Sequence, residues 1–137
     1  MKNSILIVDD DKRLRELLED YLIEKKFKVY TCDDFSSAEE ILTYFIFDLV
    51  IVDRMMPGGD GINLIRIIKK KSSTPVIMLT AMGESAKRIE GLKIGADDYV
   101  AKPFEPEELY LRINNLLELF DQNFDQNEII NFGDYFY

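Results

Sequence analysis

The sequence predicts an α/β domain in which a five-stranded parallel sheet is doubly wound by five helices. Two observations predict this fold class. Five short apolar runs alternate with five longer segments whose apolar residues recur at helical spacing. The connections are short, and repeated βα units of this kind place helices on both faces of a parallel sheet. The 137 residues, 47% of them hydrophobic, are enough to build one normal core.

The first strand is expected over residues 4–8 and the second over residues 28–32, whose alternating pattern places it near an edge of the sheet. The helix between them is amphipathic. Its expected inward residues are Leu14, Leu17, Leu18, Tyr21 and Leu22. They make one apolar stripe on a charged helix, so this helix should cover one face of the sheet.

The second helix is expected to begin at Ser36 or Ser37, since either can cap it with a glutamate three residues later in the capping-box position. Its expected inward residues are Ala38, Ile41, Leu42 and Phe45. The third strand, over residues 48–52, is mostly aliphatic and ends at Asp53, which is the pattern of a strand buried on both faces. Asp53 is therefore expected at the carboxyl end of a strand, where open α/β sheets bind their ligands.

Residues 58–61 predict a turn that leads into the third helix. The expected inward residues of that helix are Ile62, Leu64, Ile65, Ile67 and Ile68. Three lysines, residues 69–71, end it, where positive charge suits the helix C-terminus. The fourth strand, over residues 76–79, is again apolar and ends in Thr80.

The fourth helix, expected over about residues 84–94, is the weakest. Gly83, Gly91 and Gly95 lie in or beside it, and a glycine within a helix costs about 1 kcal/mol relative to alanine. This helix is therefore expected to be the easiest to move.

The end of the chain is expected to divide into three parts. Residues 1–120 form the domain, which closes with a fifth strand over residues 96–101 and a last helix that begins near Pro106. The expected inward residues of that helix are Leu109, Ile113, Leu116, Leu117 and Phe120. Residues 121–127 are polar and linker-like, and residues 128–137 are interpreted as the first strand of a further domain that continues beyond this chain.

Composition excludes several kinds of chemistry. The net charge of −9 argues against nucleic-acid binding by this stretch, because phosphate contacts need a basic face. The absence of histidine removes Ser-His and Cys-His nucleophiles and most zinc sites. No apolar run approaches the roughly 20 residues of a membrane helix, and no signal peptide is recognisable. Cys32 has no partner for a disulfide and is expected to be a half-buried strand residue, so a cytoplasmic location is expected.

Polar residues follow four of the expected strands and should gather at one edge of the sheet. They are Asp9, Asp10, Asp53, Thr80 and Lys102. Three crowded carboxylates repel one another, and a hard divalent cation with oxygen ligands, most naturally Mg²⁺, relieves that repulsion. Asp53 could then act as a nucleophile toward a phosphoryl group, with Lys102 and the Thr80 hydroxyl contacting the phosphoryl oxygens.

Each of these residues also has an ordinary structural interpretation. The triplet Asp9-Asp10-Asp11 could simply cap the first helix, Thr80 could be an ordinary strand-end residue, and Lys102 an ordinary surface lysine. Their coincidence at the ends of different strands favours a site. The motifs are Ile5-Leu6-Ile7-Val8-Asp9-Asp10-Asp11, Asp53 with Met56-Pro57 and Asp60-Gly61, Leu79-Thr80-Ala81, and Gly91-Leu92 through Gly95-Ala96-Asp97-Asp98-Tyr99 to Lys102-Pro103-Phe104.

Over about residues 3–120, these motifs resemble the receiver domain of two-component response regulators. The resemblance implies a flavodoxin-like, CheY-like (βα)5 fold and a phosphoryl group accepted from a sensor histidine kinase. It implies Asp53 as phosphoacceptor and Lys102 as a phosphoryl ligand. It implies Thr80 and Tyr99 as a switch pair. The implied Mg²⁺ ligands are Asp10, Asp9 mostly through water, Asp53 and the backbone carbonyl of Met55. The bond before Pro103 is cis in this family.

The later part of the chain is most similar to the OmpR/PhoB-type subfamily, whose receivers precede a winged-helix DNA-binding domain. The resemblance implies a homodimer on phosphorylation and DNA binding only through the missing C-terminal domain. Arg88 would pair with Glu108 of the other protomer, and Arg112 with Asp97 or Asp98. The usual basic residue near the end of the last helix is replaced around Glu118 and Leu119, which removes one expected pair.

Two other classes stay open at this point. An aspartyl-nucleophile phosphatase also forms an acyl phosphate, although such sites typically place a second aspartate where Met55 stands. A receiver-like interaction module that is never phosphorylated usually lacks a key residue, and here none is missing. The expected protein is therefore not an enzyme beyond, at most, slow self-dephosphorylation.

Overall fold

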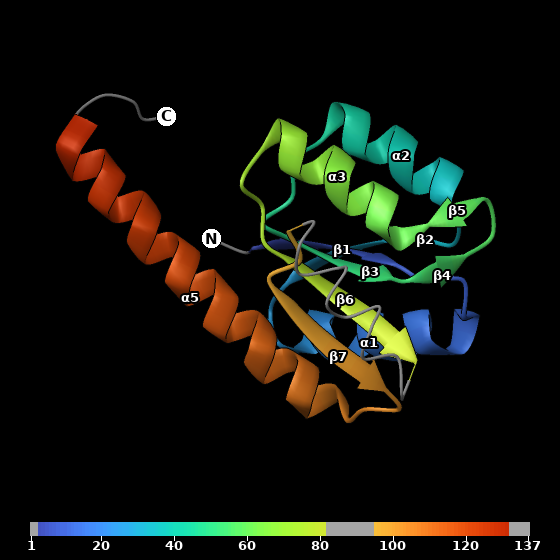
Figure 1. Cartoon of the computed structure of the whole chain (residues 1–137). Helices are drawn as coiled ribbons and strands as arrows, with labels where there is room; N and C mark the ends of the chain where they lie inside the picture. Colours follow the sequence, from blue (N-terminus) through green and yellow to red (C-terminus); the bar gives the residue numbers. More distant parts are fainter. Residues whose placement is uncertain (1–2, 82–94, 132–137) are drawn as a thin grey trace.

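A computed structural model describes residues 3–81 and 95–131 of the chain, with side chains through residue 121. Five strands form one parallel sheet in the order β2-β1-β3-β6-β7 (Figure 1). Their bounds are β1 Ser4–Val8, β2 Lys28–Cys32, β3 Leu49–Asp53, β6 Val76–Ala81 and β7 Asp98–Lys102. The predicted fold class is confirmed, with β2 at one edge and β1, β3, β6 and β7 adjacent, as the sequence led us to expect.

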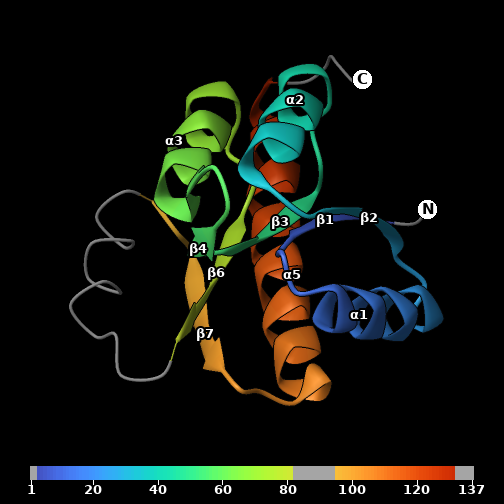
Figure 2. The ribbon, with the colours of Figure 1, turned by 90° about the vertical axis from the view of Figure 1, so that its right-hand side faces the viewer.

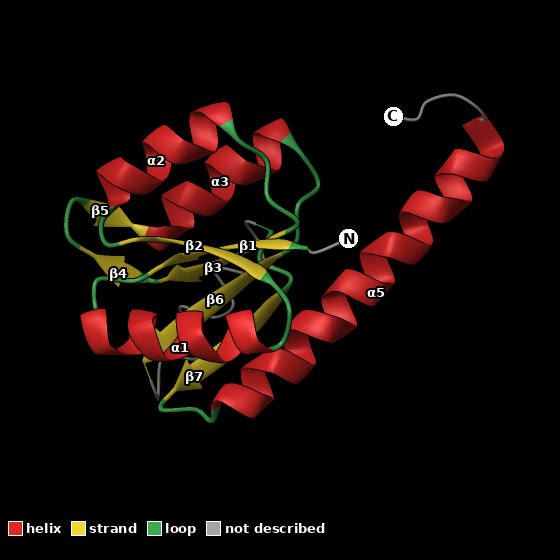
Figure 3. Ribbon diagram, turned by 180° about the vertical axis from the view of Figure 1, so that it is seen from behind, coloured by secondary structure: helices red, strands yellow, loops and turns green. Residues whose placement is uncertain are grey.

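Helices cover both faces of this sheet. The described helices are α1 Lys12–Glu24, α2 Phe35–Tyr44, α3 Gly61–Lys71 and α5 Pro106–Asn131. In Figure 2 the helices α2 and α3 lie on one side of the strands, and Figure 3 shows α1 and α5 crossing the other side. The helix expected over residues 84–94 lies outside the described residues.

The strands divide the core into two layers. Alternate residues face opposite sides of a strand, so Leu6 and Val8 pack toward α2 and α3, while Ile5 and Ile7 pack toward α1 and α5. All five residues of β3 are buried, as expected for the centre of a sheet covered on both faces. The position of Asp53 at the end of β3 is therefore fixed, because β3 is packed on both faces and paired with β1 and β6.

Two inward residues were assigned wrongly from helical spacing. Leu17 is 52% exposed on the side of α1 that faces away from the sheet. Phe45 is 60% exposed because it is the C-cap of α2, with an extended backbone that turns its side chain out of the apolar stripe. The other inward residues of the described helices are buried or half-buried as expected.

The start of α2 also differs from the prediction. Asp34, not Ser36 or Ser37, is the N-cap, and its carboxylate accepts a hydrogen bond from the backbone N–H of Ser37 at 2.8 Å. This bond lowers the pKa of Asp34. Aspartate is among the best N-cap residues, and this one lies where the chain leaves β2, so the helix begins earlier than the serines suggested.

The last helix is longer than expected. It runs to Asn131 through residues 121–127, which were predicted to be a linker, and into the stretch predicted to be a strand. Those two predictions of secondary structure are wrong for residues 121–131, and residues 132–137 lie outside the described part. The reason is that no glycine or proline occurs between Glu107 and Asn131, and polar composition alone does not end a helix.

The strand β7 begins at Asp98, two residues later than predicted. Cys32 is buried in β2, and burial raises the pKa of its thiol. None of the described helices has the length and apolar character needed to cross a lipid bilayer.

Candidate functional site

The carboxyl ends of β1, β3, β6 and β7 bring together the acidic and basic residues singled out in the sequence. Oxygen atoms of Asp9, Asp10 and Asp53 all lie within 4.8 Å of one another. The ammonium group of Lys102 lies 2.9 Å from Asp9 Oδ2 and 3.5 Å from Asp53 Oδ1. The expected cluster is therefore present as one compact group of three carboxylates and one amine.

The loop after β1 is held by its own hydrogen bonds. Asp9 is fully buried, and its Oδ1 accepts a bond from the N–H of Asp11 at 2.9 Å. The guanidinium of Arg15 donates to the Asp9 carbonyl at 2.9 Å. Asp11 in turn caps α1 by accepting from the N–H of Leu14. This helix cap leaves Asp10 exposed at the mouth of the cluster.

Burial and charge make Asp53 unusual. Burial, followed by the negative charge of Asp9, raises the pKa of Asp53 from 3.8 to about 6, against the opposing effect of Lys102. Burial by itself would lower the pKa of Lys102, but its hydrogen bond to Asp9 and the charge of Asp53 outweigh this and raise it. The carboxylates thus hold more negative charge than one lysine neutralises.

The cluster has the chemistry of a magnesium site. Its ligand atoms are all carboxylate oxygens, the hard donors that Mg²⁺ binds. A bound cation would offset the burial and the repulsion from Asp9 that together raise the pKa of Asp53. The residues present therefore fit Mg²⁺, with Asp9, Asp10 and Asp53 as its holders. Met55, in the short strand β4 (Met55–Met56), is two residues after Asp53.

If Mg²⁺ binds here, its affinity should depend on pH below about 6. Protons compete with the metal for Asp53, whose pKa is raised to about 6. We expect the dissociation constant of Mg²⁺, measured by calorimetry, to be roughly tenfold higher at pH 5 than at pH 7.5. An affinity that stays constant over this range would mean that Asp53 is not a ligand.

Thr80 and Tyr99 lie on the same face of the sheet. The cross-strand partner of Thr80 is Ala101, and Tyr99 lies two residues before it. Residues two apart on a strand point to the same face of the sheet, so Tyr99 shares this face with Thr80. Thr80 is 1% exposed, and within the described chain its hydroxyl has no hydrogen-bond partner. Tyr99 packs in the core layer under α2 and α3.

Most of the residues predicted for a dimer interface are already paired within the chain. The carboxylate of Asp97 accepts from Lys69 Nζ and from the N–H of Val76, both at 2.8 Å. Arg112 lies 2.9 Å from Asp98 and 3.4 Å from Glu108. The remaining predicted residue, Arg88, lies outside the described part.

Sequence reasoning missed a buried arginine beside the cluster. Arg54 is 6% exposed, and its Nε lies 2.8 Å from Asp60 Oδ1. The sequence does indicate this residue, because an arginine directly after a buried strand needs a partner for its charge.

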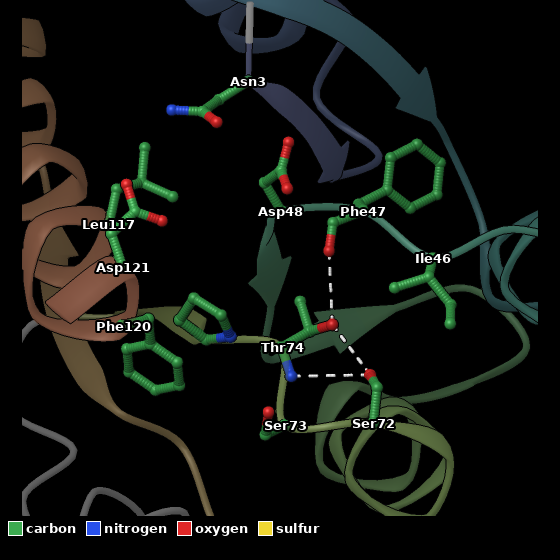
Figure 4. Close-up of a pocket in the computed structure, with 11 residues that line it drawn as sticks. Asn3, Ile46, Phe47, Asp48, Ser72, Ser73, Thr74, Leu117, Phe120 and Asp121 are labelled. Atoms are coloured by element: carbon green, nitrogen blue, oxygen red, sulfur yellow. Dashed lines mark hydrogen bonds between the residues drawn. The ribbon is translucent and has the colours of Figure 1, made fainter. Parts of the chain in front are cut away.

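A groove of about 430 Å³ lies at the opposite end of the sheet, between α5 and the loops that precede β3 and β6 (Figure 4). Its polar wall is a short network in which the Thr74 hydroxyl bonds to Ser72 at 2.7 Å and to the Phe47 carbonyl at 3.2 Å. None of its lining residues belongs to the carboxylate cluster. It is therefore not part of the candidate site.

Comparison with known proteins points to one family. A family model described as the response regulator receiver domain matches residues 5–114. Protein PetR of Rhodobacter capsulatus is 51% identical over 113 residues, which are 82% of this chain and 48% of PetR. The transcriptional regulatory protein ResD of Bacillus subtilis is 44% identical over 119 residues, 85% of this chain and 48% of ResD. The chain thus spans about half the length of these relatives.

Solved structures agree with the sequence matches. The receiver domain of the Francisella response regulator 1452 superposes with a TM-score of 0.81 at 35% identity, covering 87% of this chain and 99% of that one. The resemblance drawn from the motifs is therefore confirmed at the level of the receiver domain.

Proposed function

Because the chain belongs to the response regulator receiver domains, we propose that it accepts a phosphoryl group on Asp53 from a partner histidine kinase. Receiver domains interact with histidine kinases, bind Mg²⁺ at an acidic pocket and are generally phosphoacceptors, not enzymes. The observation that supports Asp53 most directly is its position. It lies at the end of β3, a strand that is buried along its whole length, and 3.5 Å from the amine of Lys102.

In the proposed phosphoryl transfer, Asp53 is the nucleophile and its neighbours stabilise the phosphoryl group. A carboxylate oxygen of Asp53 attacks the phosphorus, the bond from phosphorus to the kinase histidine breaks, and its electron pair stays on that histidine nitrogen. The product on this chain is an acyl phosphate. Bound Mg²⁺ supplies charge neutralisation to the phosphoryl oxygens. Lys102 places a positive charge beside them, and the backbone carbonyl of Met55 joins Asp9, Asp10 and Asp53 in holding the metal.

The switch proposal rests on the buried hydroxyl of Thr80. That hydroxyl has no partner within the described chain, so a phosphoryl oxygen on Asp53 would give it one. Movement of Thr80 toward the phosphoryl group would open space on the same face of the sheet, into which Tyr99 can turn. The two arrangements then differ in free energy according to whether Asp53 is phosphorylated, which is a population shift.

We propose that the protein is a regulator of the OmpR/PhoB type and that it dimerises on phosphorylation. Glu108, Arg112 and Asp98 form one connected charge cluster at the surface of β7 and α5. A second protomer could exchange partners with this cluster, and Arg88 would meet Glu108 across the interface. Asp97 is a weaker candidate because Lys69 and the backbone of Val76 already hold it. Surface pairs of this kind contribute about 0–1 kcal/mol each.

We further propose that residues 1–120 are the receiver and that residues beyond it lead to a DNA-binding effector domain in the cytoplasm. Two relatives with the matched region in about half of their length are named as transcriptional regulatory proteins. DNA contact would then belong to that effector domain and not to residues 1–120.

The direct test is phosphorylation in solution. Incubation with acetyl phosphate and Mg²⁺ should add one phosphoryl group by mass, and chelation of Mg²⁺ by EDTA should prevent the addition. Steady release of phosphate over many turnovers would instead indicate an aspartyl-nucleophile phosphatase. Failure to bind either Mg²⁺ or beryllofluoride would indicate an interaction module that is never phosphorylated.

Two buried threonines provide a matched test of the switch. Thr80→Val removes a hydroxyl that is unpartnered within the described chain, so we expect the free energy of unfolding of the metal-free protein to change by less than about 1 kcal/mol. The same substitution should weaken beryllofluoride binding about tenfold, because it removes a hydrogen bond to a charged group. Thr74→Val should lower the free energy of unfolding, since the Thr74 hydroxyl is bonded within the fold. It should leave beryllofluoride binding unchanged.

Denaturant unfolding and calorimetric binding would measure these two effects separately. Equal beryllofluoride affinities for the Thr80→Val and wild-type proteins would contradict a role for this hydroxyl.

A further inference from the structure

We propose that Arg54 is a positioning residue for the metal site, acting through its ion pair with Asp60 on the loop that presents Met55. This inference rests on the proposed function, because it concerns the same site. Arg54 is 6% exposed, and the phosphoryl transfer described above does not use its charge. Burial of a guanidinium costs free energy unless the charge is paired and hydrogen-bonded, so the buried position of Arg54 depends on a fixed partner.

The ion pair closes the base of a small loop. Arg54 Nε lies 2.8 Å from Asp60 Oδ1, and the Arg54 carbonyl accepts a hydrogen bond from the N–H of Gly61 at 2.8 Å. Arg54 is also bonded to the sheet, since its own N–H donates to the Leu79 carbonyl at 3.0 Å. The two ends of the loop are therefore tied to each other and to β6.

The same loop is stiffened between these ends. Met55 and Met56 pair with β5 (Gly59–Asp60) as an antiparallel hairpin beside the start of α3 (Figure 1). At the tip, the Phe35 N–H donates to the Pro57 carbonyl at 3.3 Å. Gly59 leaves no room for a side chain next to the Phe35 ring. The hairpin is thus fixed at its base by Arg54 and at its tip by Phe35.

This bracing bears directly on the geometry of the cluster. Gly61 packs so closely on the Asp53 carbonyl that any side chain there would collide with it. Asp60 Oδ1 also accepts from the N–H of Ile62 at 2.9 Å, so the carboxylate that holds Arg54 is the N-cap of α3. The ion pair therefore couples the first turn of α3 to the backbone that connects Asp53 with Met55.

Charge alone and positioning predict opposite results for Arg54→Met. Removing a positive charge near three carboxylates should tighten Mg²⁺ binding if only electrostatics matter. If the ion pair holds the loop, its loss should weaken Mg²⁺ binding. We expect the dissociation constant to rise about tenfold. This is the lower end of the loss of affinity that follows removal of an outer-shell partner from a metal site.

The matched control is Arg66→Met. Arg66 lies exposed on α3, where its guanidinium contacts Asn63 at 3.1 Å. This variant changes the net charge by the same amount without touching the loop. Its dissociation constant for Mg²⁺ should stay within about twofold of the wild-type value or become slightly tighter, as charge alone requires.

A double-mutant cycle completes the test. Asp60→Asn keeps a side-chain oxygen for the N-cap of α3 but removes the charge that holds Arg54. If the two residues act as one unit, each single variant weakens Mg²⁺ binding, and the double variant weakens it by less than the sum of the two single effects. Amide hydrogen exchange of residues 55–60 in the metal-free protein should become faster in all three variants.

The outcomes separate this inference from the proposed function. Mg²⁺ affinities within twofold of wild type in both single variants, or a tighter affinity for Arg54→Met, would overturn the positioning role. Should Arg54→Met fail to fold, the hydrogen exchange of residues 55–60 in Asp60→Asn decides the question, because the loss of its negative charge would by itself also weaken Mg²⁺ binding. If the wild-type protein does not bind Mg²⁺, the proposed function fails, and unchanged hydrogen exchange in the variants would then overturn the bracing as well.

Discussion

Asp53→Asn should abolish phosphorylation of this protein by acetyl phosphate. The amide of asparagine has no anionic oxygen to attack phosphorus, and the neighbouring carboxylates are poor substitutes. Asp9 is fully buried and already bonded to Lys102 and to the N–H of Asp11. We therefore expect no added phosphoryl group by mass spectrometry after an incubation that fully modifies the wild-type protein.

The matched control for this loss is Asp20→Asn. Asp20 is exposed on α1, so the substitution changes the same functional group away from the cluster. It should be phosphorylated at the wild-type rate. Retained modification of Asp53→Asn would assign the phosphoacceptor to another residue, which peptide mapping would identify.

The same substitution should stabilise the protein when no metal is bound. The pKa of Asp53 is raised to about 6 by burial and by Asp9, so near neutral pH the folded state holds a carboxylate in an unfavourable environment. A rise in the pKa of Asp53 from 3.8 to about 6 corresponds to roughly 3 kcal/mol. Solvent screening at the open edge of the sheet reduces this. We expect Asp53→Asn to raise the free energy of unfolding by about 1–2 kcal/mol at pH 7.5.

The stability gained by Asp53→Asn should depend on pH. A raised carboxyl pKa means that the folded protein binds the proton more tightly than the unfolded chain does. Stability attributable to Asp53 is therefore complete below its unfolded pKa of 3.8 and is lost as pH rises toward about 6. The advantage of Asp53→Asn should be present at pH 7.5 and small at pH 4.5.

Denaturant unfolding in EDTA at these two pH values would measure it, again with Asp20→Asn as the control. A wild-type protein more stable than Asp53→Asn at pH 7.5 without metal would show that Lys102 more than compensates the repulsion from Asp9.

The interior of the fold follows from local chemistry. Runs such as residues 49–52 are too apolar to remain in water and too short for helices. Short connections then leave a parallel sheet as the arrangement that buries both their faces. The aspartate at the end of β3 was therefore predictable as a strand-end residue. Helix boundaries were less predictable, because Asp34 competes with two serines as a cap and nothing in residues 121–131 stops a helix.

Local residue patterns are enough to predict the order of the elements, the sheet edge that holds the polar residues, and the kinds of side chain that meet there. Which of those side chains touch depends on how the folded chain packs. Lys102 lies closer to Asp9 than to Asp53, Arg112 pairs within its own chain, and Arg54 finds Asp60 across the base of a loop. Strand order brings residues to one edge, whereas charge pairing and pKa depend on distances that arise when separate loops pack together.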